Sequence, residues 1–534
     1  MKKLILFLLL CSLANAALYD LNTLKKKDNS LAKDYYIHRL LEQNKISKQE
    51  AQSLRKHIFR YAGKIKKALD ILAPRKAYID PKYAKCYNYN SKSIVDANLT
   101  CQIFRLNSLQ FISNMDANTR TKLANKLKNS NGNLSILVSS FNHTNPLNFI
   151  IENSNTTHFF KLWSYFKNPD LHLSGAYLDK LALERAFKDF SRNIIIKNTH
   201  PNIRKSFLEI SPQSPKAESA FYMGVNALIF NKEQKAQAFF ENAYKTYEKR
   251  YDKDNALFWV YQIGKKETDL NTLATSPSLN IYSIWAKEMK GIKDLPKFTL
   301  LEAKNKNNAN FDMKDPFLWQ SLSKEISKAD KNKLEKMSKE FNAQNTLPIY
   351  AYILERVYNF NNNYFIMPYY EYIKDYDKKR QALILAIGRQ ESRFIPTAVS
   401  TSYALGMMQF MPFVANHIAK KELKLEKFDQ DDMFEPKTAY FFANHHLNYL
   451  EKELKSPVLI SYAYNGGIGF TKKMLERGLF KAGKYEPFLS MELVTFTESR
   501  IYAKRVLANY IVYLHLLNDN TKISSIFESL IQRN

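Results

Sequence analysis

The stretch 217-AESAFYMGVNALIFNKEQKAQAFFENAYKTY-247 predicts two packed helices. In each half, small and apolar residues recur every three or four positions, which places them on one face of a helix. They are Ala220, Phe221, Gly224, Ala227 and Leu228, then Ala236, Phe239, Phe240, Ala243 and Tyr247. The polar pair Asn231-Lys232 separates the halves. The pattern therefore predicts an antiparallel helix pair with small residues at its crossing.

Segments of this kind continue from about residue 20 to 300, and none alternates like a sheet. The pair is similar to a tetratricopeptide-type pair, but a strict period of roughly 34 residues does not recur. We therefore expect an all-α fold that begins with an irregular superhelix of stacked helices. Polar residues at 303–315 and a junction at 361–370 suggest its divisions. The expected domains are 17–302 (superhelix), 303–371 (linker and small helical linker domain) and 372–534 (a final compact domain).

Residues 1–16 predict a secretory signal peptide. They begin with two lysines, continue with an apolar run and end in small residues before Ala17. A lipoprotein would use Cys11, but the leucines at 8–10 are not the small residues that such a site prefers. No later apolar stretch is long enough to span a bilayer. We therefore expect an exported, periplasmic protein with no transmembrane segment in its mature form.

Two cysteines, Cys86 and Cys101, remain once the signal peptide is removed. An even pair in an oxidising compartment predicts a disulfide, and the alternative is two unrelated free thiols. In the chain-entropy model, closing a loop of this size stabilises the fold by roughly 3 kcal/mol.

The formal net charge of the chain is +29 at pH 7. Such a charge favours polyanionic partners, and export excludes nucleic acid in favour of envelope polymers that carry carboxylates or phosphates. The alternative is a composition that is simply rich in Lys, because the lysines are dispersed along the chain. Charge alone does not decide between them.

Glu391 lies in the segment 386-AIGRQESRFIP-396, on the apolar face of a predicted helix. Ile384, Ile387 and Gly388 precede it at helical spacing, and Pro396 disfavours helix just beyond it. Burial in a last helical turn would favour the protonated carboxyl, as a general acid requires. A structural glutamate with a hydrogen-bond partner explains this segment equally well.

Three later segments strengthen the catalytic interpretation. They are "AVSTSYALGMMQFMP" (398–412), "SYAYNGGIGF" (461–470) and "FTESRIYAKRVL" (496–507). Together with the Glu-Ser helix end, they resemble the motifs of the soluble lytic transglycosylases over about residues 380–510. Three departures are Met407 for the usual Leu, Ser499 for Thr, and Thr495 where a proline is common.

The resemblance implies a goose-lysozyme-like, mostly α catalytic domain carried on a ring-forming superhelix. It implies that Glu391 is the single acid and base that cleaves the bond between N-acetylmuramic acid and N-acetylglucosamine and leaves a 1,6-anhydro end. The residues that match the family's cleft are Ser400, Gln409, Met411, Tyr464, Asn465 and Glu498. The implied partners are peptidoglycan glycan strands and muropeptides, with no cofactor.

Two other functions remain possible. A hydrolytic muramidase would need a second carboxylate, about 5 to 9.5 Å from the first. The acidic segment 428-FDQDDMFEP-436 offers candidates, but we interpret it as a solvated turn that opens a helix. A non-catalytic envelope scaffold would only grip the glycan. We expect no metal site, because His445 and His446 are adjacent and face different sides of a helix, and His417 has no evident pairing with them.

Overall fold

The computed structural model describes residues 19–75, 78–305 and 308–531. The predicted signal peptide lies outside these residues. The chain forms two compact units. The first contains residues up to 75, 294–472 and 501–530, and the second contains 76–293 and 473–500. Each unit combines distant stretches of the chain, so this division does not test the three continuous domains expected from the sequence. Those domain limits stay a prediction.

The first unit is helical apart from one minimal sheet. Its helices are α1 (Leu21–Lys26), α2 (Leu31–Glu42), α3 (Lys48–Leu54), α4 (Gly63–Leu72), α19 (Pro316–Lys328), α20 (Lys331–Glu340), α21 (Leu347–Val357), α22 (Lys378–Ser392), α23 (Pro412–His417), α24 (Pro436–Leu454), α25 (Pro457–Gly466) and α29 (Ile523–Leu530). Strands β1 (Thr299–Leu300) and β2 (Tyr364–Phe365) pair in parallel, Thr299 with Tyr364. Two-residue strands are too short to show an alternating pattern, so they could not be predicted from the sequence.

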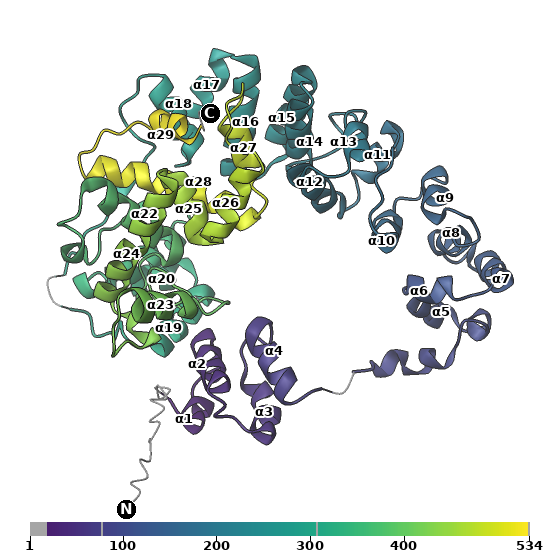
Figure 1. Ribbon diagram of the computed structural model, residues 1–534, viewed down its shortest axis with the longest axis horizontal. Helices are drawn as coiled ribbons and strands as arrows, with labels where there is room; N and C mark the ends of the chain where they lie inside the picture. Colours follow the sequence, from purple (N-terminus) through teal and green to yellow (C-terminus); the bar gives the residue numbers. More distant parts are fainter. Residues whose placement is uncertain (1–18, 76–77, 306–307, 532–534) are drawn as a thin grey trace, which may run out of the picture. The chain divides into compact units, whose positions relative to one another are not determined.

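The second unit is entirely helical among its described residues (Figure 1). Its helices are α5 (Leu99–Leu106), α6 (Leu109–Ser113), α7 (Ala117–Leu127), α8 (Gly132–Ser140), α9 (Pro146–Glu152), α10 (Phe159–Tyr165), α11 (Gly175–Leu181), α12 (Phe187–Lys197), α13 (Pro201–Ser206), α14 (Glu218–Ile229), α15 (Glu233–Thr246), α16 (Arg250–Gly264), α17 (Glu267–Ala274), α18 (Ile281–Met289) and α27 (Phe488–Glu492). Helices α26 (Ile468–Glu476) and α28 (Thr497–Leu516) each contain residues of both units. The predicted all-α class is confirmed.

The predicted helix pair at 217–247 is α14 and α15. The rings of Phe221 and Phe240 pack 5.3 Å apart between the two helices. A Cβ atom at Gly224 would lie 2.8 Å from the ring of Phe240, so the glycine allows the helices to approach closely. Asn231 turns the chain with φ 55°. The periodicity therefore predicted both helices and their contact.

The predicted disulfide between Cys86 and Cys101 is present, with an S–S distance of 1.99 Å. It joins the 3₁₀ segment Pro81–Asn88 to α5, and both cysteines are buried. The bond therefore fastens a segment without α-helical hydrogen bonding to a regular helix.

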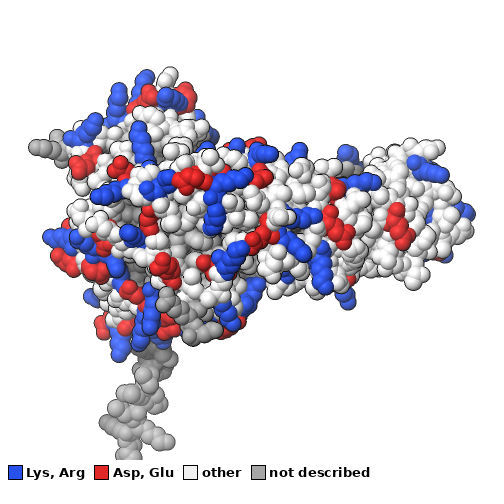
Figure 2. Space-filling model, turned by 90° about the horizontal axis from the view of Figure 1, so that it is seen from above, with Lys and Arg blue, Asp and Glu red and all other residues white. Residues whose placement is uncertain are grey.

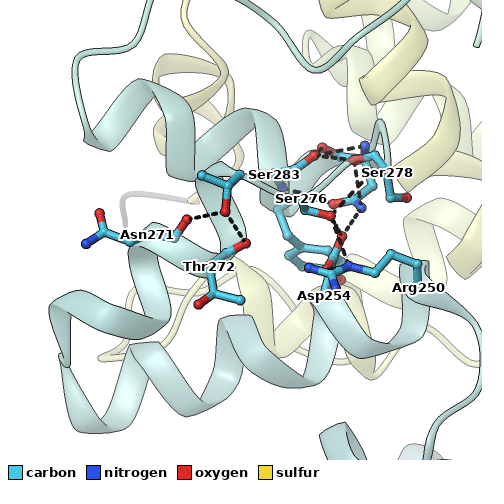
Figure 3. Close-up of polar contacts among 10 residues, drawn as sticks. Arg250, Asp254, Asn271, Thr272, Ser276, Ser278 and Ser283 are labelled. Carbon is cyan, nitrogen blue, oxygen red and sulfur yellow. Dashed lines mark hydrogen bonds and ion pairs between the residues drawn. The ribbon is translucent and has the colours of Figure 1, made fainter.

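A buried carboxylate, Asp254 of α16, organises the connection between α17 and α18 (Figure 3). Its Oδ2 atom accepts hydrogen bonds from Ser276 (2.5 Å) and Asn280 (2.8 Å), and its Oδ1 atom lies 2.9 Å from Nε of Arg250. Burial raises the pKa of Asp254, although these three partners oppose the shift. The network ties Arg250 and Asp254, one helical turn apart on α16, to Ser276 and Asn280, which lie more than 20 positions later.

Lys and Arg side chains are spread over the face shown in Figure 2, with Asp and Glu between them. On this face the positive charge does not form a single patch. None of the helices in 19–75, 78–305 and 308–531 is both long and apolar enough to cross a membrane.

Candidate active site

Glu391 lies in the last turn of α22, as the sequence predicted. The side chain of Asp377 caps the start of this helix by accepting from the backbone N–H of Arg380 at 3.0 Å. The helix ends at Ser392, because Arg393 adopts a left-handed backbone conformation with φ 59°. Glu391 is half-buried. Its carboxylate therefore stands at the end of a helix whose preceding turns are buried.

The apolar face that precedes Glu391 is buried at Ile384, Ile387 and Gly388. A Cβ atom at Gly388 would lie 2.8 Å from the ring of Phe394 and 3.2 Å from the sulfur of Met408. The glycine thus allows Phe394 to fold back against the helix just after it ends. This packing fixes the end of the helix that carries Glu391.

Tyr502 of α28 donates a hydrogen bond to Oε1 of Glu391 at 2.7 Å. Its side chain is buried, and it comes from a segment 111 positions later in the sequence. Tyr502 lies in the segment 496–507 that the motif comparison singled out, but it was not among the candidate site residues. The signal that could have identified Tyr502 is its position two residues after the Glu498-Ser499-Arg500 segment of the motif.

The two arginines that flank Glu391 are paired with another glutamate, Glu355 of α21. Nε of Arg393 lies 3.0 Å from each carboxylate oxygen of Glu355, and Arg389 lies 3.5 Å from Oε1. Arg389 also donates to Asn509 of α28 at 2.8 Å. Burial, and then the charge of Arg393, lowers the pKa of Arg389 to about 10. One carboxylate therefore serves both flanking arginines and neutralises part of their positive charge.

The segment that follows α22 is held by backbone hydrogen bonds and by polar side chains. Ser392 donates to the carbonyl of Met407 at 2.8 Å. Oγ of Ser400 accepts from the backbone of Ala404 at 2.9 Å, and the amide nitrogen of Gln409 donates to the carbonyl of Gly406 at 2.7 Å. The candidate residues Ser400 and Gln409 therefore shape this loop, whatever they also contact in a ligand.

Gly406 is required by the same loop for two reasons. Its backbone is left-handed, with φ 76°, and a Cβ atom there would lie 2.0 Å from the carbonyl oxygen of Met433. Only glycine satisfies both conditions without moving the backbone. The loop is thus pressed directly against the segment that precedes α24.

Tyr464, on α25, lies beside this loop and close to the candidate acid. Its hydroxyl donates to the carbonyl of Met408 at 2.8 Å. Burial, and then the charge of Glu391, raises the pKa of Tyr464 well above its ordinary value. The ring of His446 lies 5.8 Å from that of Tyr464, and burial lowers the pKa of His446 to about 4. Tyr464 therefore places an aromatic side chain near Glu391 on this side.

The other candidate residues are placed as follows. Met411 is half-buried at the start of α23, and Asn465 is half-buried near the end of α25. Glu498 is in the first turn of α28 and belongs to the second compact unit. The first unit thus brings together Glu391, the loop and Tyr464, whereas a role for Glu498 stays a prediction.

The acidic segment at 428–436 opens a helix, as expected, but it is not solvated. Asp429 and Asp431 bind Arg39 of α2; Arg39 lies 3.1 Å from Asp431 and makes its closest contact with Asp429. Tyr35 donates to Asp431 at 2.5 Å, and burial raises the pKa of Asp431. The expectation of a solvated turn was wrong, because residues near the start of the chain cover this segment.

His417 and His445 approach one carboxylate, Glu422, at 3.3 Å and 2.6 Å. No sequence pattern predicts that these two histidines contact the same carboxylate. Within the part of the chain that the structure describes, no group of three or more His, Cys, Asp or Glu side chains is arranged to hold a metal ion.

Comparison with known proteins gives a family match that covers Glu391, the loop and Tyr464. Residues 368–485 match the family model described as "Transglycosylase SLT domain". The soluble lytic murein transglycosylase of Escherichia coli strain K12 is 28% identical over 215 residues, which are 39% of this chain and 33% of that protein. A putative soluble lytic murein transglycosylase of Haemophilus influenzae is 34% identical over 143 residues, 26% of this chain and 23% of that protein. These matches span about a third or less of the relatives' length.

Similarity in structure extends over most of the chain. The lytic transglycosylase Slt of Pseudomonas aeruginosa, solved as an inactive mutant, aligns with a TM-score of 0.51 and 13% identity, covering 92% of this chain and 82% of that one. A 70-kDa soluble lytic transglycosylase in complex with bulgecin A gives 0.51 and 14%, covering 93% and 83%. At such identity the likeness concerns the fold alone. The chain therefore carries a transglycosylase SLT domain and shares the fold of the soluble lytic transglycosylases.

Proposed function

We propose that this protein is an exported lytic transglycosylase that cleaves peptidoglycan glycan strands with Glu391 as its acid and base. The observation that carries the proposal is the placement of Glu391. Glu391 lies half-buried at the end of α22, within residues 368–485 that match the SLT domain. It accepts a hydrogen bond from Tyr502 of α28. The relatives in Escherichia coli and Haemophilus influenzae are named as lytic murein transglycosylases, the latter as a putative one, which supports murein as the substrate.

In the proposed reaction, Glu391 first donates its proton to the oxygen that links C1 of N-acetylmuramic acid to the next N-acetylglucosamine. The C1–O bond breaks and the leaving sugar departs as an alcohol. Glu391, now a carboxylate, takes the proton from the C6 hydroxyl of the same muramyl residue. That oxygen bonds to C1 and closes a 1,6-anhydro ring. The glutamate ends protonated, as it began, and no water is consumed.

The protein supplies three contributions to this reaction. Tyr502 would orient the carboxylate and donate to its ionised form. Glu355 engages Arg389 and Arg393, the cations nearest to Glu391 in the sequence. The loop at 398–411, with Met411, Tyr464 and Asn465, would line the glycan site. Glu498 would bind glycan only if α28 presents it to the same cleft.

Hydrolysis by the same domain is the main alternative. Retaining and inverting glycosidases ordinarily use two carboxylates. The acidic candidates of the segment 428–436 are Asp429, Asp431, Asp432 and Glu435. Asp429 and Asp431 bind Arg39, Asp432 accepts a hydrogen bond from the backbone N–H of Asp429 at 2.9 Å, and Glu435 lies 2.7 Å from Nζ of Lys314. An ion-paired, hydrogen-bonded carboxylate is a poor nucleophile or base, which favours the mechanism with one glutamate.

The test is to digest purified cell-wall sacculi with wild-type and Glu391→Gln protein and to identify the products by mass spectrometry. We expect the wild type to release muropeptides with 1,6-anhydro ends and the variant to lose at least about 10²-fold in rate, the contribution typical of general acid–base catalysis. A matched control is Glu340→Gln, which makes the same change at an exposed residue of α20.

Each result has a clear meaning. Reducing ends in place of anhydro ends would establish a hydrolytic muramidase. Unchanged release by the Glu391→Gln protein would remove Glu391 as the acid. Binding of sacculi without turnover by the wild type would support the non-catalytic scaffold.

A further inference from the structure

A cavity of about 520 Å³ lies in the second compact unit, within the helical part of the chain. It is formed by the 3₁₀ segment Pro81–Asn88, α5, the start of α8 and the start of α10. Its volume is within the range of small-molecule sites in proteins, about 300 to 1,000 Å³. The transglycosylase reaction proposed above makes no use of it.

One wall of the cavity is aromatic. Tyr83 and Phe104 stack with their ring centroids 4.3 Å apart and their planes nearly parallel, at 5°. The disulfide between Cys86 and Cys101 joins the two segments that carry these rings, three positions from each. The wall is therefore preformed. Because the rings stack on each other, they offer their edges and an outer ring face to a ligand, and such apolar surface suits the C–H face of a pyranose ring.

The cavity also contains a cation without an anion. Lys161 of α10 donates to the backbone and side-chain oxygens of Asn107, the latter at 2.8 Å, and both acceptors are neutral. None of the residues that line the cavity is acidic. Among the described residues Lys161 forms no ion pair, and burial lowers its pKa. A half-buried ammonium in such surroundings is complementary to a carboxylate.

Neutral hydrogen-bonding groups surround this cation. Nε2 of His158 is buried and has no hydrogen-bond partner in the described part of the chain. Burial, and then the charge of Lys161, lowers the pKa of His158, so its ring is neutral near pH 7. Asn131 and Asn133 use their side-chain oxygens for contacts within the protein, with Leu134 and Asn155. The amide nitrogens are therefore left as donors for sugar hydroxyl or acetamido oxygens.

We propose that this cavity binds a muramyl-type amino sugar, with the lactyl carboxylate on Lys161 and the pyranose ring against Tyr83 and Phe104. Aromatic surface, amide donors and an unmatched cation together fit a sugar acid better than a neutral sugar. The choice of a muramyl ligand rests on the proposed function, whereas the preference for a carboxylate rests on the cavity itself. The helical unit would then hold glycan independently of the site at Glu391.

Hydrogen exchange followed by mass spectrometry tests this on the full chain. The Glu391→Gln protein is incubated with N-acetylmuramic acid or with N-acetylglucosamine, which lacks the lactyl carboxylate. We expect N-acetylmuramic acid to slow exchange in peptides that cover α5, the start of α8 and α10, at concentrations about tenfold lower than N-acetylglucosamine requires. Lys161→Met should abolish that difference between the two sugars.

Two controls make the outcome clear. Lys122→Met removes the same charge from an exposed position of α7 and should leave the preference unchanged. Tyr83→Ala should weaken the effect of both sugars. Equal effects of the two sugars on the Glu391→Gln protein, or the same preference in the Lys161→Met protein, would overturn the proposal. Equal protection by sodium acetate would reduce the site to a simple anion site and would also overturn it.

Failure here is distinguishable from failure of the proposed function. The Lys161→Met protein should still release 1,6-anhydro muropeptides from sacculi, because Lys161 has no role in the proposed chemistry. Loss of the sugar preference with retained anhydro products supports both proposals. Anhydro products from a wild type that shows no protection at α5 and α10 would leave the proposed function standing and reject this site.

Discussion

Tyr502 donates its hydroxyl hydrogen to Oε1 of Glu391 at 2.7 Å, across 111 positions of sequence. The two residues lie on α28 and α22, which are also joined through Asn509 and Arg389. A donor that holds one carboxylate oxygen fixes the rotation of the glutamate.

Tyr502→Phe should lower kcat about tenfold with a smaller change in KM, since the hydroxyl acts on Glu391 rather than on substrate. A hydrogen-bond donor stabilises the ionised carboxylate. Its loss should therefore also shift one limb of the pH–rate profile, the limb that reports loss of the Glu391 proton. The expected shift is to higher pH, by up to about one pH unit. Rates of sacculus digestion across pH provide the measurement. Tyr510→Phe removes a hydroxyl from the same helix and should change neither quantity; equal effects of the two changes would reject this role for Tyr502.

His446 should make the first unit less stable in mild acid. Its pKa is lowered by burial from an ordinary 6.5 to about 4, so below pH 6.5 the unfolded chain takes up a proton that the folded chain refuses. Stability should fall by about 3 kcal/mol between pH 6.5 and 4. His446→Phe keeps a ring beside Phe410 and Tyr464 and should flatten that decline in urea unfolding. His143→Phe, at an exposed ring, serves as the control; a decline that persists in the His446→Phe protein would contradict the assignment.

Gly406→Ala should destabilise the first unit by more than about 1 kcal/mol, because the added methyl group meets the carbonyl of Met433 in a left-handed backbone. Thermal unfolding and sacculus digestion should both show the loss. Gly469→Ala is the matched change, since a Cβ atom there meets nothing within 4 Å. That variant should be neutral or slightly more stable, as expected for alanine in a helix. Equal melting temperatures for the two variants would exclude the predicted clash.

Asp254→Ala should lower the stability of the second unit by about 3 kcal/mol, because Asn280 loses its buried acceptor and Arg250 its counter-ion. Faster hydrogen exchange in peptides covering α16 to α18 would report the loss locally. Asp189→Ala breaks an exposed pair with Arg192 and should cost less than about 1 kcal/mol. Unaltered exchange in the Asp254→Ala protein would show that the network in Figure 3 does not hold this connection.

The features that were predicted correctly from the sequence depend on local information. The spacing around Gly224 gave two helices and their contact, and the spacing around Gly388 placed Glu391 in the last turn of its helix. Cys86 and Cys101 were paired because only two cysteines remain after the signal peptide. In each case the deciding information lies within a few turns of helix or in a count of residues.

What the sequence did not predict depends on pairing over long distances. Tyr502 could not be assigned to Glu391 without knowing that α28 lies against α22. The same holds for Arg39, which turns an apparently solvated acidic segment into a buried ion pair. Matching motifs identified Ser400 and Gln409 as cleft residues but could not show that both side chains hold their own loop.

The pairing of Glu355 with Arg389 and Arg393 has a practical consequence for dissecting the protein. Glu355 precedes residue 372, where motif content alone would start a minimal enzyme. Such a fragment would expose two guanidinium groups with no carboxylate to neutralise them, next to the glutamate on which the proposed reaction depends. Poor activity of that fragment would then reflect altered electrostatics around Glu391 rather than the loss of glycan contacts. A fragment that is meant to retain the native environment of Glu391 should therefore begin before α21.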